Sequence, residues 1–258
     1  MPIQSLPDSQ SVPYVLPLKP LALADSGGFI TNVTFRSPAD HPNVCLIQAN
    51  YDLACFDEQL FTTLRLPVPL HLNKAVRKRR AEYLASRALV RHALCRLGSD
   101  PWILANDASR APVWPAGFSG SLSHSTQEIA LLLAKAESGK LLGVDCEQVM
   151  RAETAEAMQE NIITPQEKHL LMQSGLPFPD ALTLAFSLKE SLYKALSPRL
   201  RKFMSFSEAE IVFCAPQAEK VLLRLTTSHS SDFPAGREFT GRVERTSSRI
   251  LSWIVEAL

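Results

Sequence analysis

The chain has 258 residues, of which 46% are hydrophobic and 21% are charged, and its formal net charge is +1. This composition is typical of a globular protein with one large domain or two modest ones, and it excludes a strongly basic surface for nucleic acid. The five scattered cysteines form no CxxC pair, which argues against a disulfide framework or a zinc site and suits a reducing compartment.

The first quarter of the chain predicts two strands and a short helix. Residues 1–27 are rich in Pro, Ser and Leu and are expected to form an irregular arm, without the basic segment and apolar run of a signal peptide. Residues 28–36 and 44–51 predict strands, and residues 52–64 predict a short helix. No apolar run approaches the roughly 20 residues that span a bilayer. We therefore expect a cytoplasmic protein that does not enter a membrane.

A long helix follows over residues 73–97, with Asn73 as its N-cap and Gly98 as its C-terminal stop. Its apolar residues recur at helical spacing, and residues 77–80 are all basic. Cations at a helix N-terminus oppose the helix dipole, so this run hints at an anionic partner. For any one of these residues, however, a solvated basic surface is the simpler reading.

The middle of the chain predicts a loop and then three strands. Residues 100–120 are rich in Pro, and residues 120–123 predict a short strand that leads into the sequence Ser-His-Ser. Residues 127–134 and 141–146 predict a strand pair around a polar turn at 137–140. A lone histidine such as His124 is more often structural than functional.

The strand at residues 141–147 carries two acids at its end. Alternate residues of a strand share a face, so Asp145 and Glu147 point one way while Val144 and Cys146 point the other. Two neighbouring carboxylates repel each other unless a cation lies between them, and a hard divalent ion such as Mg2+ prefers oxygen ligands. The alternative is an acidic strand end in solvent.

The last part of the chain predicts two helices and four strands. Thr164, Pro165 and Glu167 have the spacing of a capping box that opens a helix. A second helix over residues 180–196 places Glu190 and Lys194 four apart, where a stabilising ion pair is the usual interpretation. Strands are expected near residues 210–213, 221–225, 237–245 and 250–255.

Five segments, in this order, resemble the motifs of the Sfp-type 4'-phosphopantetheinyl transferases, and in particular the enterobactin-synthase component D branch. The segments are residues 77–87, 111–115, 120–125, 143–147 and 186–191. The resemblance covers residues 70–205 and is most specific in the acidic strand and the Lys-Glu-Ser segment. It implies an α/β (α+β) fold of two similar, pseudo-symmetric halves, residues 1–140 and 141–258. Each half would pack a small, mostly antiparallel sheet on a long helix, with the active site at the junction.

The resemblance also implies an enzyme and its reaction. The phosphopantetheine arm of coenzyme A would pass to a serine hydroxyl of an apo carrier protein, with release of adenosine 3',5'-bisphosphate. Such a transfer depends on positioning and charge neutralisation, which suits a Mg2+ site. The partners implied are coenzyme A and an acyl, peptidyl or aryl carrier of siderophore, polyketide or fatty-acid synthesis. A monomer is expected, because the two halves of one chain would form the site.

Site residues follow by matching motif position. Asp145, Glu147 and Glu190 would hold Mg2+, and Glu190 would also be the general base for the serine, either directly or through a metal-bound water. Lys194, with Lys189 as a second candidate, would neutralise charge on the leaving phosphate. Ser123 and His124 would contact the coenzyme A phosphates, with Asp145 beside them. Arg87 would bind the nucleotide end at the 3'-phosphate, and Arg110 would lie near the adenine.

Cys146 departs from the family pattern, which usually has Ile between the two acids. A buried cysteine behaves as a small hydrophobe, so the change is expected to alter packing and not metal binding. Two other functions are possible for such a chain: a silent module that binds coenzyme A or a carrier, and a nucleic-acid binder with a basic helix. The acids and Lys194 are all present, which counts against the first, and the near-neutral charge counts against the second.

Overall fold

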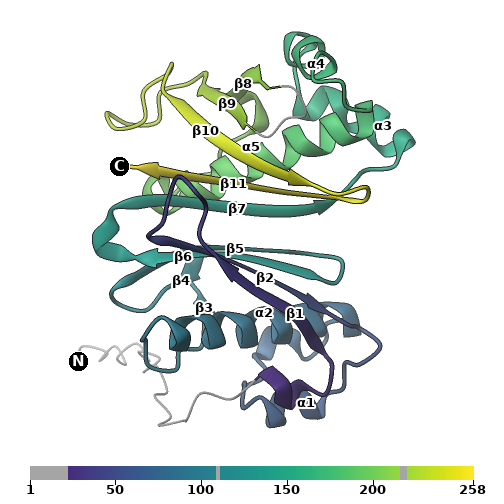
Figure 1. Ribbon diagram of the computed structural model, residues 1–258, viewed down its shortest axis with the longest axis vertical. Helices are drawn as coiled ribbons and strands as arrows, with labels where there is room; N and C mark the ends of the chain where they lie inside the picture. Colours follow the sequence, from purple (N-terminus) through teal and green to yellow (C-terminus); the bar gives the residue numbers. More distant parts are fainter. Residues whose placement is uncertain (1–22, 109–110, 216–219) are drawn as a thin grey trace, which may run out of the picture.

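The computed structural model describes residues 23–108, 111–215 and 220–258, and it has an α+β fold built from antiparallel sheets and several helices (Figure 1). The arm predicted at the N-terminus lies outside the described residues up to residue 22. None of the described helices combines the length and the apolar character needed to cross a bilayer.

The first sheet is formed in the order β1-β2-β6-β5, and all its strand pairs are antiparallel. One face of this sheet packs on helix α2, whose buried Leu84, Ala88 and Leu94 belong to one apolar cluster with Ile47 and Leu131 of the sheet. The elements of this part are β1 (Ile30–Arg36), β2 (Val44–Tyr51), α1 (Gln59–Thr63), α2 (Arg77–Arg96), β3 (Ala105–Asn106), β4 (Pro112–Val113), β5 (Phe118–Ser125) and β6 (Glu128–Lys135).

Helix α2 begins at Arg77, so the prediction of Asn73 as its N-cap is wrong. Residues Leu70–Leu72 form a separate 3-10 turn that ends at Asn73, because the side chain of Leu72 is buried and fixes the chain there. Val76 is the extended residue before the helix and gives no side-chain cap. The predicted stop at Gly98 agrees with the structure, since this glycine has a φ of 84°.

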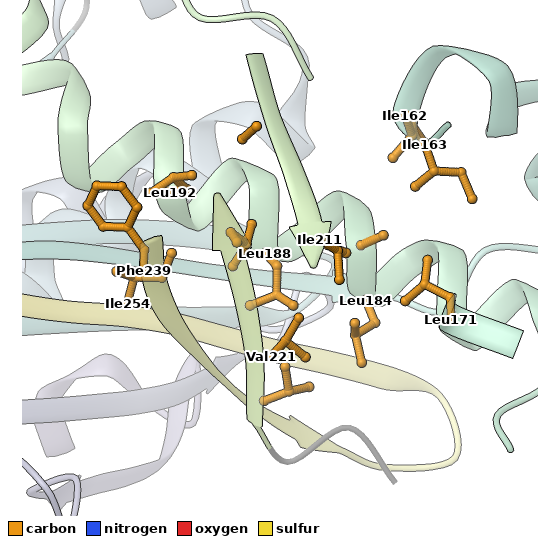
Figure 2. Close-up of a cluster of buried hydrophobic side chains, with 14 of the residues drawn as sticks. Ile162, Ile163, Leu171, Leu184, Leu188, Leu192, Ile211, Val221, Phe239 and Ile254 are labelled. Atoms are coloured by element: carbon orange, nitrogen blue, oxygen red, sulfur yellow. The ribbon is translucent and has the colours of Figure 1, made fainter. Parts of the chain in front are cut away.

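The second sheet has the order β7-β11-β10-β9-β8 and is also antiparallel. Helix α5 crosses it and buries Leu184, Leu188 and Leu192 against Val221 and Phe239, as Figure 2 shows. The elements are β7 (Lys140–Gln148), α3 (Ala152–Ile162), α4 (Pro165–Met172), α5 (Phe178–Leu200), β8 (Ala209–Cys214), β9 (Lys220–Leu225), β10 (Glu238–Arg245) and β11 (Arg249–Ala257).

Strands β6 and β7 do not pair with each other, so the predicted hairpin around residues 137–140 is wrong. β6 has β2 and β5 on its two edges, and β7 pairs with β11. The residues between them form a 3-10 turn that ends at Gly139 and carries the chain from one sheet to the other.

The two sheets pack face to face between the two long helices. Apolar side chains of β2 and β6 meet those of β7 and β11 in a third buried cluster, which includes Leu46, Leu132, Val144 and Trp253. Helix α2 therefore covers the far face of the first sheet and α5 the far face of the second, and α3 and α4 pack on α5 in turn (Figure 1). The internal similarity of the two halves stays a prediction.

Candidate functional site

The end of β7 points its acids toward helix α5, because its residues alternate between two faces. A Cβ atom on Gly143 would lie only 1.8 Å from the carbonyl oxygen of Ser191, so this face of the strand touches the helix backbone. Asp145 and Glu147 follow at the same parity. Val144 and Cys146 face the other way, into the core between the sheets. The alternation predicted for the acidic strand is therefore confirmed.

Asp145 lies at the centre of a polar group formed by three elements. Its side chain is 3% exposed, and its Oδ1 atom accepts hydrogen bonds from Ser123 Oγ at 2.8 Å and Lys194 Nζ at 2.7 Å. Lys194 also donates to Ser123 Oγ at 3.0 Å. These residues belong to β7, β5 and α5, so two predicted phosphate-site residues and a predicted metal ligand do come together.

Strand β5 reaches this group because it lies along the free edge of β7. The backbone amide of Val144 donates to Ser121 Oγ at 3.0 Å. Ser123 follows two residues later and therefore lies on the same side of β5. The other oxygen of Asp145, Oδ2, is buried and has no hydrogen-bond partner within the described part of the chain. A buried carboxylate oxygen without a partner is costly, so it marks a place for a cation or a donor.

Glu147 and Glu190 lie in the electric field of the same group. The pKa of Glu147 is raised to about 7, chiefly by burial and also by the charges of Asp145 and Glu190, while Lys194 opposes the rise. Burial also raises the pKa of Glu190, again with Lys194 opposing and Asp145 contributing to the rise. The three predicted metal ligands therefore crowd negative charge into one region.

Asp145, Glu147 and Glu190 suit Mg2+ in their chemistry but not in their present spacing. Three carboxylates and an unpartnered buried oxygen are the donor set that a hard cation prefers. In the described residues, however, no three metal-ligating side chains converge closely enough to hold an ion. Instead, the Lys194 ammonium group lies beside Asp145. The donors fit the ion, whereas their present spacing does not close around one.

His124 follows on β5 and contacts the basic start of α2. Its Nε2 atom lies 3.3 Å from the guanidinium of Arg79, which also pairs with Glu82 at 3.4 Å. Burial lowers the pKa of His124, Glu82 opposes this, and the nearby cations Arg79 and Lys194 lower it further. Arg79 was not singled out by sequence reasoning. The run of cations at the start of α2 was the signal that could have found it.

Arg87 is buried on α2 and held by neutral groups. Its guanidinium donates to the carbonyl of Leu104 at 3.1 Å and to Asn106 Oδ1 at 2.7 Å, and it stacks over Tyr83 at 4.7 Å. Within the described residues it pairs with no carboxylate. A buried cation without an acid nearby favours an anionic ligand. Arg110, predicted near the adenine, lies outside the described residues.

Lys189 does not join this group, and its predicted role at the phosphate is corrected here. Its ammonium forms an ion pair with Glu167 at 2.8 Å, with both side chains only 2% exposed. It also donates to the carbonyl groups of Ile162 at 2.8 Å and Phe206 at 3.1 Å. All three of its donors are used inside the protein, so none remains for a phosphate.

The site residues lie in segments that match two family models. The 4'-phosphopantetheinyl transferase N-terminal domain matches residues 69–134, and the 4'-phosphopantetheinyl transferase superfamily matches residues 141–238. The first match contains α2 and β5, and the second contains β7 and α5.

Three curated proteins show the extent of the similarity. Enterobactin synthase component D of Salmonella typhi is 40% identical over 58% of this chain and 62% of its own length. The protein of the same name from Escherichia coli (strain K12) is 42% identical over 56% of this chain and 67% of its own length. The 4'-phosphopantetheinyl transferase Npt of Nocardia iowensis is 33% identical over 57% and 65%. The chain thus spans less than two thirds of the length of the Salmonella relatives it matches.

Proposed function

Because the chain belongs to the 4'-phosphopantetheinyl transferase superfamily, we propose that it transfers the 4'-phosphopantetheine arm of coenzyme A to an apo carrier protein. The serine hydroxyl of the carrier attacks the phosphorus on the pantetheine side of the pyrophosphate. The bond from that phosphorus to the bridging oxygen breaks, and adenosine 3',5'-bisphosphate leaves. The carriers served are those of siderophore, polyketide or fatty-acid synthesis, and the name shared by the Salmonella typhi and Escherichia coli relatives favours the enterobactin type.

The group around Asp145 is the observation that carries this proposal. It combines a buried carboxylate oxygen without a partner, two further acids, and the cation Lys194. Phosphoryl transfer needs such a mixture, because negative charge must be neutralised while a hydroxyl is deprotonated. Within it, Glu190 takes the serine proton, and its raised pKa makes it a stronger base than an ordinary glutamate.

Each remaining residue has a role on the phosphates. Asp145, Glu147 and Glu190 would hold Mg2+, which supplies charge neutralisation to the pyrophosphate when it is bound. Lys194 neutralises the charge that develops on the leaving phosphate. Ser123 and His124 bind the pyrophosphate, and an anion beside His124 would raise the lowered pKa of its imidazole. Arg87 binds the 3'-phosphate.

We extend the proposal to the oligomeric state, the division into halves and the cellular location of the protein. The chain works as a monomer, since α2, β5, β7 and α5 of one chain supply all the groups named above. It divides at residue 140 into an N-terminal half that holds the nucleotide and a C-terminal half that holds the metal. It works in the cytoplasm, in agreement with the five free cysteines.

Incubation with coenzyme A, Mg2+ and a purified apo carrier protein tests the reaction. Mass spectrometry should show a gain of one phosphopantetheine on the carrier, and the carrier with its serine replaced by alanine should show none. Binding of coenzyme A without any mass gain across a panel of carriers would contradict a transferase and support the silent binding module.

A further inference from the structure

The segment after helix α5 presents an aromatic ring to the solvent. Phe203 is 79% exposed, whereas Phe213, the other exposed phenylalanine of the described residues, is 45% exposed. The neighbouring residues Arg199, Arg201 and Lys202 are exposed as well. We call these four residues the Phe203 surface.

The backbone and one neighbouring ring hold Phe203 in this outward position. Arg201 ends α5 in a left-handed conformation with a φ of 49°, and Met204 is buried directly after the phenylalanine. The ring of Phe203 lies 6.1 Å from the ring of Tyr193 on α5. An aromatic side chain anchored on both sides loses little entropy when a partner covers it, which is typical of residues that dominate binding.

The charges of the Phe203 surface are unpaired. Within the described residues, the side chains of Arg199, Arg201 and Lys202 form no ion pair and no hydrogen bond. Other arginines of the same sheet and helix region do pair with acids, as Arg224 does with Glu210. Three free cations around an apolar ring are complementary to an acidic surface that presents an aliphatic side chain.

The Phe203 surface also adjoins the candidate site through Tyr193. On α5, Tyr193 is three residues after Glu190 and directly before Lys194, so it is a neighbour of Glu190 on the helix surface. The ring contact with Phe203 continues this face toward the solvent. A protein that docks here would lie beside the group that must receive its hydroxyl.

We propose that the acceptor protein of the transfer reaction docks on the Phe203 surface, with an acidic face that places an aliphatic side chain against Phe203. This proposal rests on the proposed function. A membrane is a poorer occupant, because interfacial binding needs an extended apolar face and this surface offers one exposed aromatic ring. Charge complementarity sets the rate and specificity of docking, and the ring supplies contact area.

Two variants and two matched controls test the docking surface. Arg201→Glu reverses a charge in the Phe203 surface, and Arg65→Glu reverses a charge on another exposed arginine with the same left-handed φ of 49°. Phe203→Ala removes the exposed ring, and Phe213→Ala removes a ring that is 45% exposed on β8. We expect Arg201→Glu and Phe203→Ala each to raise the KM for the apo carrier about tenfold. The affinity for coenzyme A, measured by calorimetry, should stay unchanged, and so should the carrier KM of both controls.

Several results would overturn the docking surface. If the carrier KM is unchanged in both variants, the docking surface is rejected and the transferase function stands. The docking surface is also rejected if the carrier KM rises equally in the two controls. Loss of binding to vesicles with anionic lipid, with carrier KM unchanged, would assign the surface to a membrane. If the wild-type chain modifies no carrier, the proposed function fails. Direct binding of labelled carrier then tests the docking surface alone, and equal affinity of the wild type and Phe203→Ala for the carrier rejects it.

Discussion

Replacing Lys189 by methionine should destabilise the fold without weakening coenzyme A binding. The substitution keeps the length of the side chain and removes the ammonium, so the carboxylate of Glu167 loses its counter-ion at 2.8 Å. Both side chains are only 2% exposed, and this burial lowers the pKa of Lys189 while the charge of Glu167 opposes the shift. Glu167 would remain fixed in place, since its other bonds go to the backbone amides of Thr164 and Ile211.

The size of the effect follows from the burial of both partners. Removal of one member of a buried ion pair costs about 3–5 kcal/mol, because the other charge is left without compensation. The two carbonyl groups of Ile162 and Phe206 also lose a donor, and each such loss adds about 1 kcal/mol. A domain is stable by only about 5–15 kcal/mol, so we expect Lys189→Met to unfold at a much lower urea concentration.

Urea denaturation followed by tryptophan fluorescence measures the loss. Lys168→Met is the matched control, since Lys168 is exposed on α4 and should cost less than about 0.5 kcal/mol. The double variant Lys189→Met with Glu167→Gln should recover about 2 kcal/mol, because the uncompensated charge is gone. The reasoning is refuted if Lys189→Met loses less than about 1 kcal/mol while its affinity for coenzyme A falls.

Three further predictions concern the candidate site. Glu190→Gln should abolish transfer to the carrier and leave the urea midpoint near that of the wild type; near-normal turnover would remove Glu190 from the role of base. Chelation of Mg2+ should stop the wild-type reaction, and added Mg2+ should restore it. Asp145→Ala should stay inactive in both conditions and bind Mg2+ more weakly by calorimetry. An unchanged metal titration would contradict the acidic site. Arg87→Ala should raise the KM for coenzyme A more than that for dephospho-coenzyme A, and equal rises would place the 3'-phosphate contact elsewhere.

Local rules predicted the parts of the structure that depend on neighbouring residues. The two-residue period of a strand was enough to place Asp145 opposite Cys146, because the side chains of β7 have only two directions. The capping box at Thr164 and Glu167 forms as predicted, since its bonds connect residues three apart.

Partners that are distant along the chain could not be predicted in this way. Consecutive strands with a short connection usually pair, yet β6 and β7 enter different sheets because the edges of β6 are taken by β2 and β5. The partner of Lys189 is Glu167 on another helix, and no local spacing connects them. Helix α3 was not predicted; only Ala155 and Ile162 of its residues are buried, so few of its side chains belong to the core.

The apolar layer between the two sheets limits how this protein can respond to a substrate. Ser123 and Asp145 come from opposite sheets, and those sheets are joined by buried side chains such as Leu132 and Trp253. The ion pair between Arg36 and Glu244 joins the same two sheets at the rim of this layer. A hinge motion that separated the two sheets would expose this apolar layer to water. We therefore expect the two sheets to stay packed together through every turnover. Substrate selectivity must then arise from side-chain rotations and surface loops, while the two sheets keep their positions relative to each other.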